Sequence, residues 1–584
     1  MIKLLKNFTK KDWLLSLLIL IFILFQVWLD LKMPDYVSEI TRLIQTEGTE
    51  IKSIIINGGY MLLCALGSLL SAILVGYLVS MVSASFSMNV RSKLFKKVLD
   101  LSYHDVKQFS TSSLITRTTN DITQIQMVIS MGLQTLIKAP ITAILAISKI
   151  LNKNIEWSII TLIGVIVLTT TILIIMFIVT PRFKKVQKLI DNLNGITREN
   201  LIGIRVIRAF NAEDYQLNKF EDVNENLTKT QLFNQKVFAF LSPVMYLVMH
   251  GLTLSIYFVG AFLIKDALFA DKLTIFGNMI VFSSYATQVI MSFLMLSMIF
   301  MMLPRASVSA NRINEVINTT SLIKEGNVSR CKEKGTVEFK NVSFKYPDAE
   351  EYILKDISFK ANKGETVAFI GLTGSGKSTL INLVPRFYDV TEGEVLVNGV
   401  NVKDYKQEYL NNKIGYVPQK AIIFNDTVIN NVGYGDNGKR ITLKKIKEAI
   451  KVAEAENFVL QMDNGYNTNL SQGGTNISGG QKQRLSIARA IAKEPEIYIF
   501  DDTFSALDYK TDSNLRKNLK KYTKDATVLI VAQRIGTIIS ADRILVINEG
   551  RIVGNGTHKE LLKTCDIYKE IALSQLSKEE LENA

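Results

Sequence analysis

The residues with the clearest chemistry form a glycine-rich stretch, GLTGSGKST, at positions 371–379. It matches the pattern G-x-x-x-x-G-K-[ST], in which backbone N–H groups surround the phosphates of a nucleotide. In this pattern Lys377 reaches the β- and γ-phosphates, and the hydroxyl of Ser378 ligates Mg²⁺. The apolar run 367–370 predicts a strand that leads into the loop, and the residues after the loop predict a helix whose positive end faces the phosphates. The predicted phosphate contacts are Gly371, Leu372, Thr373, Gly374, Ser375, Gly376, Lys377, Ser378 and Thr379.

A second candidate lies far downstream, where the apolar run 497–500 ends in two adjacent acids, Asp501 and Asp502. Such a run predicts a buried strand that delivers carboxylates to a site at its carboxyl end. Taken alone, a strand followed by two acids is a weak indication of a metal site. Combined with the upstream phosphate loop, it predicts that Asp501 holds Mg²⁺ together with Ser378.

A third stretch, NISGGQ at 476–481, precedes a helical run at 482–493. Small residues at the start of a helix can form an anion site, and this one is suited to a γ-phosphate. An ordinary glycine turn before a helix is the alternative.

Together these segments resemble the motifs of ATP-binding-cassette (ABC) ATPases, in which ISGGQ is the signature. The resemblance implies that Tyr346 stacks on adenine, and that Gln419 in YVPQ senses and ligates Mg²⁺. It also implies that residues 505–508 (SALD) cross the interface between two such domains. In that family each ATP lies between the phosphate loop of one domain and the signature of the other. The signature residues expected to act on the partner's ATP are Ser478, Gly479, Gly480 and Gln481.

Two positions depart from the family pattern. Active members carry Glu at the position of Asp502, where it polarises the attacking water, and His at the position of Gln533, where it contacts the γ-phosphate. The chain's three histidines, His104, His250 and His558, lie elsewhere in the sequence. A carboxylate shortened by one methylene no longer reaches a water held in line, and a displacement of about 1 Å can cost about a hundredfold in rate. The site is therefore predicted to bind ATP but hydrolyse it poorly, the alternative being that Asp and Gln substitute with modest loss.

These motifs need a folded domain, and the composition shows that a second, apolar domain accompanies it. Hydrophobic residues make up 48% of the 584 residues, with a mean hydropathy of +0.19, while charged residues still reach 21%. Residues 13–31 are almost free of charge and long enough to cross a bilayer core of about 30 Å. A signal peptide, the alternative, would have a shorter apolar core and a cleavage site of small residues. Further spans are predicted at 56–82, 125–148, 158–180, 238–264 and 275–303.

Basic residues set the predicted orientation of these six spans. Lysines cluster before the first span, and basic loops follow the second and fourth, so the N-terminus and the ATPase domain are expected in the cytoplasm. The same bias explains the net charge of +14. We find no motif for nucleic-acid binding, and the three cysteines lie too far apart in sequence for a metal-ligand pattern. A multi-pass protein of the cell (plasma) membrane is predicted.

The predicted fold is therefore multi-domain, with an all-α six-helix transmembrane domain (1–323), a polar linker (324–335) and an α/β P-loop ATPase domain (336–584). Six spans followed by one ATPase domain resemble a half-transporter of the exporter type (type IV), and the resemblance covers essentially the whole chain. Residues 109–126 and 203–215 resemble the elements that dock the membrane helices onto the ATPase.

The altered site implies a heterodimer in which the partner half-transporter carries Glu and His at the positions of Asp502 and Gln533. The chain then resembles the degenerate-site subunit of bacterial multidrug exporters, with amphipathic or hydrophobic compounds as substrates. A regulatory ATP-binding subunit that gates its partner, and an exporter of lipid or peptide, are the alternatives.

Two features of the spans could contact a small-molecule substrate. His250 is an ionisable residue within the fifth span. The sixth span carries methionines, which suit varied ligands but equally suit lipid-facing or core positions: Met279, Met291, Met295, Met298, Met301 and Met302.

Overall fold

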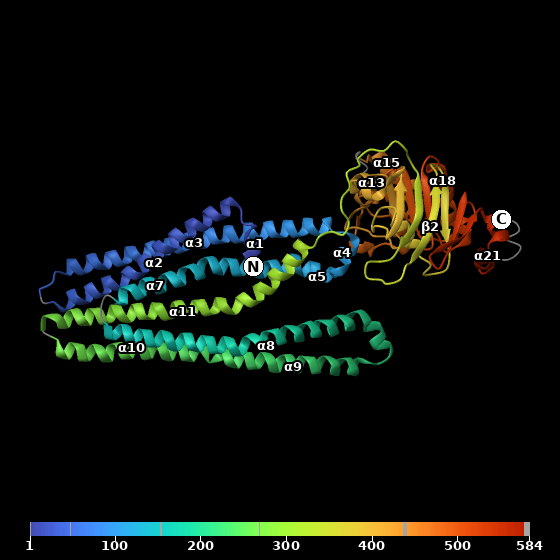
Figure 1. Cartoon of the computed structure of the whole chain (residues 1–584). Helices are drawn as coiled ribbons and strands as arrows, with labels where there is room; N and C mark the ends of the chain where they lie inside the picture. Colours follow the sequence, from blue (N-terminus) through green and yellow to red (C-terminus); the bar gives the residue numbers. More distant parts are fainter. Residues whose placement is uncertain (1, 47, 152–154, 268, 436–440, 577–584) are drawn as a thin grey trace. The chain divides into compact units, whose positions relative to one another are not determined.

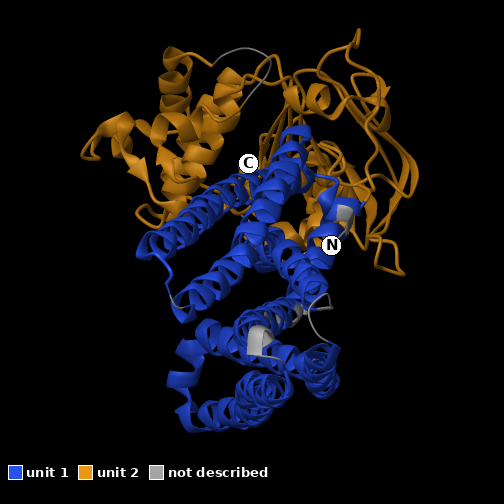
Figure 2. Cartoon of the chain, turned by 90° about the vertical axis from the view of Figure 1, so that its left-hand side faces the viewer, with its two compact units in different colours: residues 1–99, 111–319 blue, residues 100–110, 320–584 orange. Residues whose placement is uncertain are grey.

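The computed structural model describes residues 2–46, 48–151, 155–267, 269–435 and 441–576. They form two compact units, coloured separately in Figure 2: unit 1 is 1–99 with 111–319, and unit 2 is 100–110 with 320–584. Unit 2 is therefore built from two stretches of chain.

All the elements that the described residues of unit 1 form are helices, and six helical segments are long and apolar enough to cross a membrane. The six predicted spans are thus confirmed. Most of the helices extend well beyond the apolar run that identified them (Figure 1), as α3 does by reaching Asp100. The long helices are α2 (Lys10–Gln45), α3 (Ile51–Asp100), α8 (Ile155–Ala209), α9 (Glu213–Ala239), α10 (Leu241–Asp266) and α11 (Phe269–Asn318). The third span is assembled from α5 (Thr111–Thr116), π-helix η1 (Arg117–Asp121), α6 (Ile122–Met131), π-helix η2 (Gly132–Leu136) and α7 (Ile137–Leu151), and a short α1 (Ile2–Leu5) precedes them all.

The first span shows how the sequence builds these helices. Thr9 and Asp12 form a capping box, which satisfies the free backbone N–H groups at the start of α2. Ile19, Ile23 and Val27 recur every four residues, so they lie along one helical face, and all are buried in the unit 1 core. The opposite face exposes large apolar side chains such as Phe25 and Trp28, as expected of a helix that contacts lipid.

Two acids of α2, Asp30 and Asp35, are paired with lysines of α7. Asp30 of α2 lies 3.2 Å from the ammonium of Lys138 on α7 and accepts a 2.5 Å hydrogen bond from Ser68 of α3. Asp35 lies 3.2 Å from Lys149 and accepts a 2.8 Å bond from the buried hydroxyl of Tyr285 on α11. Such pairing is the usual way in which a helix bundle accommodates ionised groups away from water.

Unit 2 combines a six-stranded sheet with a four-stranded antiparallel sheet. The six-stranded order is β12-β11-β3-β10-β9-β6, parallel except for the edge strand β12, and the four-stranded order is β2-β1-β4-β5. A separate pair, β7 with β8, is antiparallel. The strands are β1 (Val337–Phe344), β2 (Leu354–Ala361), β3 (Thr366–Ile370), β4 (Glu392–Val397), β5 (Val400–Asn401), β6 (Ile414–Val417), β7 (Asp426–Thr427), β8 (Asn469–Leu470), β9 (Ile497–Asp501), β10 (Thr527–Val531), β11 (Arg543–Asn548) and β12 (Arg551–Gly556).

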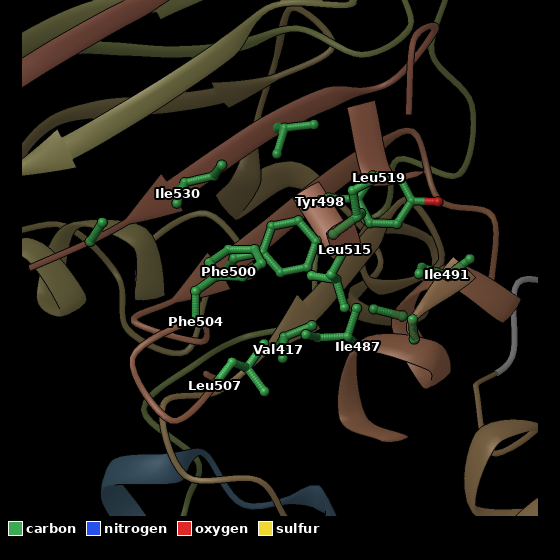
Figure 3. Packing of buried hydrophobic residues seen from close by; sticks show 14 of the residues in the cluster. Val417, Ile487, Ile491, Tyr498, Phe500, Phe504, Leu507, Leu515, Leu519 and Ile530 are labelled. Atoms are coloured by element: carbon green, nitrogen blue, oxygen red, sulfur yellow. The ribbon is translucent and has the colours of Figure 1, made fainter. Parts of the chain in front are cut away.

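One face of the parallel sheet of unit 2 packs on helices, and the other packs on α12 and the four-stranded sheet. Both faces are therefore covered, which is why the central strands are almost entirely apolar. All five residues of β9 are buried. Side chains from β9, β10, α17 and α18 meet in one core (Figure 3): Tyr498, Phe500, Ile530, Ile487, Ile491, Leu515 and Leu519. The helices are α4 (Tyr103–Gln108), α12 (Lys377–Asn382), α13 (Gln407–Asn412), α14 (Val428–Val432), α15 (Leu443–Val452), α16 (Glu456–Leu460), α17 (Gly479–Ala492), α18 (Tyr509–Tyr522), α19 (Ile535–Ile538), α20 (His558–Thr564) and α21 (Asp566–Leu573), with short 3₁₀ turns η3 (Val402–Asp404), η4 (Gly465–Asn467) and η5 (Gln472–Gly474).

Candidate functional site

Four loops meet at the carboxyl edge of the parallel sheet because the strands before them end in register. Val531 of β10 pairs with Asp501 of β9 on one side and with Phe369 of β3 on the other. Val417 of β6 pairs with Phe500. The phosphate loop, the acid pair and the positions Gln533 and Gln419 therefore converge, as ligand sites do in open α/β sheets.

The phosphate loop is shaped by glycines in left-handed backbone conformations. Gly376 has φ 97°, and a Cβ there would lie 2.8 Å from Leu354. The Lys377 ammonium donates to the carbonyl oxygens of Gly371, at 2.9 Å, and Leu372, at 2.7 Å. Burial lowers the pKa of Lys377, although the nearby carboxylates Asp502 and Asp501 oppose that shift. The loop thus presents backbone N–H groups and one cation to the same space, which suits an anionic phosphate chain.

Ser378 and Asp501 form the predicted metal-binding pair. The Ser378 hydroxyl donates a 2.8 Å hydrogen bond to Asp501 Oδ1. Burial raises the pKa of Asp501, and the bond from Ser378 opposes the rise. Two oxygen ligands at the mouth of a phosphate loop fit Mg²⁺, which in such sites takes its remaining ligands from phosphates and water. In the described ranges, no group of three or more His, Cys, Asp or Glu side chains could hold a metal ion.

The two residues that depart from the family pattern, Asp502 and Gln533, are hydrogen-bonded to each other. Asp502 Oδ2 accepts a 2.9 Å hydrogen bond from Gln533 Nε2 and a 3.2 Å bond from Gln419 Nε2. Burial raises the pKa of Asp502, and the hydrogen bonds from Gln419 and Ser505 oppose the rise. Asp502 also has a left-handed backbone, with φ 45°. The carboxylate is thus held by two side-chain amides of the protein.

Tyr346 lies beside the start of α12, and its hydroxyl is 3.0 Å from that of Thr379. Its ring makes edge contacts with Phe344 and Tyr388, each at a centroid distance of 5.1 Å. The aromatic expected to stack on adenine is therefore held next to the phosphate loop by its own packing.

The signature residues lie apart from this cluster. Ser478 caps α17 in a capping box with Gln481, whose side chain accepts a 2.9 Å bond from the Ser478 N–H. A Cβ added at Gly479 would meet no atom within 4 Å. Among the described residues, no hydrogen bond joins the signature to the phosphate loop. The exposed start of α17 is consistent with action on a nucleotide held elsewhere.

The switch loop, which we define as residues 533–535, has one partner that sequence reasoning missed. Gln575, just after α21, accepts a 2.8 Å bond from the Ile535 N–H and donates a 2.8 Å bond to the Gln533 carbonyl. The side chain of Arg534 donates a 3.2 Å bond to the Ser505 carbonyl. No sequence pattern points to Gln575, because it lies 42 residues from Gln533 and belongs to no motif.

The two segments expected to dock onto an ATPase domain differ in their placement. Unit 2 contains residues 100–110, where the Tyr103 ring lies edge-on to Tyr388 at 6.1 Å and Asp105 accepts a 3.3 Å bond from the Leu322 N–H. Residues 111–126 belong to unit 1. The other segment, 203–215, spans the turn from α8 to α9, where Phe210 is 78% exposed.

The possible substrate contacts in unit 1 have mixed surroundings. His250 is exposed on α10 and stacks on Tyr246 at 6.2 Å. On α11, Met291 and Met295 are exposed, and Met279 is buried. Met302 is half-buried, and the side chains of Met298 and Met301 lie outside the described part of the chain.

Comparison with known proteins gives two family matches. Residues 16–293 match the ABC transporter transmembrane region, and residues 354–505 match the model described as ABC transporter. The chain is 34% identical to the uncharacterized ABC transporter ATP-binding protein YfiB of Bacillus subtilis, over 98% of each chain. It is 32% identical to an ATP-dependent lipid A-core flippase of Pseudomonas savastanoi, over 86% of this chain and 82% of the other.

The chain is also similar to a protein named as a putative multidrug exporter and to one solved structure. Identity to the putative multidrug export ATP-binding/permease protein YgaD of Bacillus subtilis is 32%, over 83% of this chain and 82% of that one. The fold is similar to that of a bacterial Atm1-family ABC exporter solved with ATP bound. That match has a TM-score of 0.84 and 23% identity, and it covers 97% of this chain and all of the other, 100%.

Proposed function

The chain belongs to the ABC transporter family, and from that premise we propose that it is the degenerate-site half of a heterodimeric exporter of the plasma membrane. As a member it is an ATP-driven multi-pass membrane protein, with six spans followed by a cytoplasmic ATPase domain that uses ATP and Mg²⁺. The proposal adds that its own site binds ATP but hydrolyses it poorly. The observation that carries it is the capture of Asp502 Oδ2 by the amides of Gln533 and Gln419.

This arrangement supports slow hydrolysis for two reasons. A general base must lie within hydrogen-bond reach of the water it activates, and here the carboxylate oxygen already accepts two hydrogen bonds from the protein. In addition, Gln533 has no imidazole with which to contact a γ-phosphate, and its amide is directed at Asp502. Lys377, Ser378 and Asp501 keep the arrangement needed to hold ATP, and Mg²⁺ would neutralise charge on its phosphates.

Two exposed surfaces support a partner subunit. The signature at the start of α17 is open to solvent at Gly479, where the backbone of a helix start suits a phosphate. The turn between α8 and α9 exposes several large apolar side chains close together, which is rare on the surface of a monomeric soluble protein. They include Leu201, Ile202, Val206, Phe210, Tyr215 and Leu217. We infer that a second half-transporter, with Glu and His at the positions of Asp502 and Gln533, covers both surfaces.

The proposed substrates are amphipathic or hydrophobic compounds. Support comes from the exposed Met291 and Met295 on α11 and from the exposed pair Tyr246–His250 on α10. Thioether and aromatic side chains contact varied apolar ligands. A lipid is the second candidate substrate, because one relative is by name a lipid A-core flippase.

Purified without a partner, the chain is expected to bind Mg²⁺–ATP and to turn it over very slowly, because both water-handling positions are altered. ATP binding is measured by equilibrium titration, and phosphate release by a steady-state assay on the same preparation. Adding the cognate half-transporter should restore turnover. Fast hydrolysis by a demonstrated homodimer would contradict the degenerate-site assignment, and it would leave the assignment to the ABC family untouched.

Replacing Tyr346 with Ala is expected to weaken ATP binding about five- to 150-fold, because loss of a base–aromatic stack costs about 1–3 kcal/mol. Tyr346→Phe keeps the ring and loses only the hydroxyl contact with Thr379, so its Kd should stay within about threefold of wild type. The Kd for ATP of the full chain is the measurement. Equal Kd values for the Ala variant and the wild type would show that Tyr346 does not stack on adenine.

A further inference from the structure

The switch loop after β10 depends on a residue outside it to fix its backbone. Helix α19, which begins at Ile535, has Arg534 at its N-cap position, and the Arg534 side chain makes no capping hydrogen bond. The free N–H groups at a helix start need acceptors. Gln575 supplies one, since its Oε1 accepts from the Ile535 N–H at 2.8 Å.

The same side chain also holds the other end of the loop. Gln575 Nε2 donates to the Gln533 carbonyl at 2.8 Å, so one amide bridges the two ends of a three-residue loop. Ala532 and Ile535 are buried in the core, whereas Gln533 and Arg534 between them are exposed. The backbone at Gln533 and Arg534 is therefore held mainly by hydrogen bonds, and Gln575 supplies one of them.

Gln575 is in turn fixed by the packing of the C-terminal helix. Tyr568 and Ala572 of α21 are fully buried, and Leu576, the next residue after Gln575, packs against the same core. The Tyr568 hydroxyl lies 2.6 Å from Nδ1 of the buried His558. Gln575 itself is exposed, so the buried residues of α21 hold its backbone, and the two bonds to the loop orient its amide.

The loop that Gln575 fixes is the one that controls Asp502. Gln533 donates to Asp502 Oδ2 at 2.9 Å, and Ser505, which receives the Arg534 side chain on its carbonyl, donates to the Asp502 carbonyl at 2.8 Å. A carboxylate next to the phosphate site repels a bound triphosphate. Anchoring that carboxylate to an amide keeps it from approaching the phosphates.

We propose that Gln575 is a positioning residue for this chain's ATP site, through which helix α21 stabilises the ATP-retaining arrangement of the switch loop. The inference rests on the proposed function, because it presumes that ATP is retained here. When the bridge is lost, Gln533 releases Asp502 more often, and ATP leaves the site faster.

The test uses the full chain, purified in nanodiscs with the half-transporter that assembles with it and loaded with 8-azido-ATP and Mg²⁺. Nucleotide remaining on this chain is followed by cross-linking, since the two subunits separate on a gel. In Gln575→Ala the half-time of nucleotide loss should shorten about three- to tenfold, as expected for one or two lost hydrogen bonds. Deuterium uptake in a peptide containing Ile535 should accelerate in the same preparation.

Two variants serve as matched controls. Ser574→Ala removes only a local bond to the Ile571 carbonyl, so nucleotide loss and deuterium uptake should equal those of wild type. Gln575→Glu keeps the acceptor for the Ile535 N–H and loses the donor to the Gln533 carbonyl. Its deuterium uptake should stay near wild type, while nucleotide loss becomes faster than in wild type. This second variant also carries the test if Gln575→Ala assembles poorly.

A double-mutant cycle separates positioning from general destabilisation. In a Gln533→Ala background the side chain that Gln575 positions is gone, so adding Gln575→Ala should change nucleotide loss no further. An effect of the same size in that background would overturn the inference, and so would unchanged nucleotide loss in Gln575→Ala alone. Wild-type transporter that fails to retain nucleotide would instead contradict the proposed function.

Discussion

Gly479→Asp in this chain is expected to lower the ATPase activity of the assembled transporter at least about a hundredfold, whereas Lys377→Ala should lower it only partly. The signature completes the partner's working site, where charge on the γ-phosphate must be stabilised in the transition state, and loss of one such donor costs about a hundredfold or more. An added carboxylate at that point also repels the phosphate. Lys377, in contrast, serves a site that hydrolyses little.

The local structure at Gly479 can accept an Asp side chain without disturbing the fold. Space around Gly479 is open, with no atom within 4 Å of an added Cβ, so the variant should fold normally. Ser478→Ala should also be severe, but it removes a helix cap as well, at a cost of about 1 kcal/mol in stability. Gly479→Asp is therefore the variant to compare with Lys377→Ala.

The measurement is steady-state ATPase activity of each single variant with wild-type partner, at matched assembly. In a symmetric pump both changes would damage equivalent sites, and the two losses would be similar. If Lys377→Ala were as damaging as Gly479→Asp while the partner's site still bound ATP, the two sites of the transporter would be equivalent and the degenerate-site proposal would be wrong.

The combined variant Asp502→Glu and Gln533→His is expected to raise ATP hydrolysis at this chain's site by about a hundredfold. Glu extends the carboxylate by one methylene, and positioning errors of about 1 Å have costs of this order. Replacing Gln533 removes an amide that now holds Asp502 Oδ2. Each single change should give a smaller gain, because Asp502→Glu alone leaves that amide in place.

Hydrolysis at this chain's site is measured separately by mutating the general base of the partner, so that the partner's site no longer hydrolyses ATP. The control is Asp502→Gln with Gln533→His, which has the same side-chain length but no carboxylate to accept a proton, and it should stay at the background rate. A gain of less than about threefold in the Glu and His variant, with ATP binding retained, would mean that other residues suppress hydrolysis here.

Local sequence patterns were sufficient to predict those contacts of the site that involve neighbours in sequence or residues at strand ends. The contact of Ser378 with Asp501 follows from a phosphate loop and an acidic strand that end at one sheet edge. That Gln533 and Gln419 both donate to one oxygen of Asp502 could not be predicted, because it depends on rotamers set by tertiary packing. Gln575 reaches the site only through the docking of α21, a long-range contact that leaves no local pattern in the sequence.

In unit 1, too, some features could be predicted from the sequence and others could not. Hydropathy located the six spans because lipid exposure selects apolar side chains. It did not give the helix ends: the second span was expected at 56–82, while α3 runs over Ile51–Asp100. The polar extension carries no apolar run, so hydropathy does not mark where it ends. The π-helices η1 and η2 likewise have no signature in hydropathy.

The paired charges of unit 1 also bear on how the chain is made. Asp30 precedes Ser68 by 38 residues and Lys138 by 108, and a ribosome adds about 5–20 residues per second. Newly synthesised α2 therefore waits about 5 to 20 seconds for the lysine that neutralises it. Asp30 lies one residue from the end of the predicted span 13–31, so its unpaired charge costs less than the about 2.5–3.5 kcal/mol of the bilayer centre. The ion pair of Asp30 with Lys138 is thus expected to form only after the third span has been inserted beside the first.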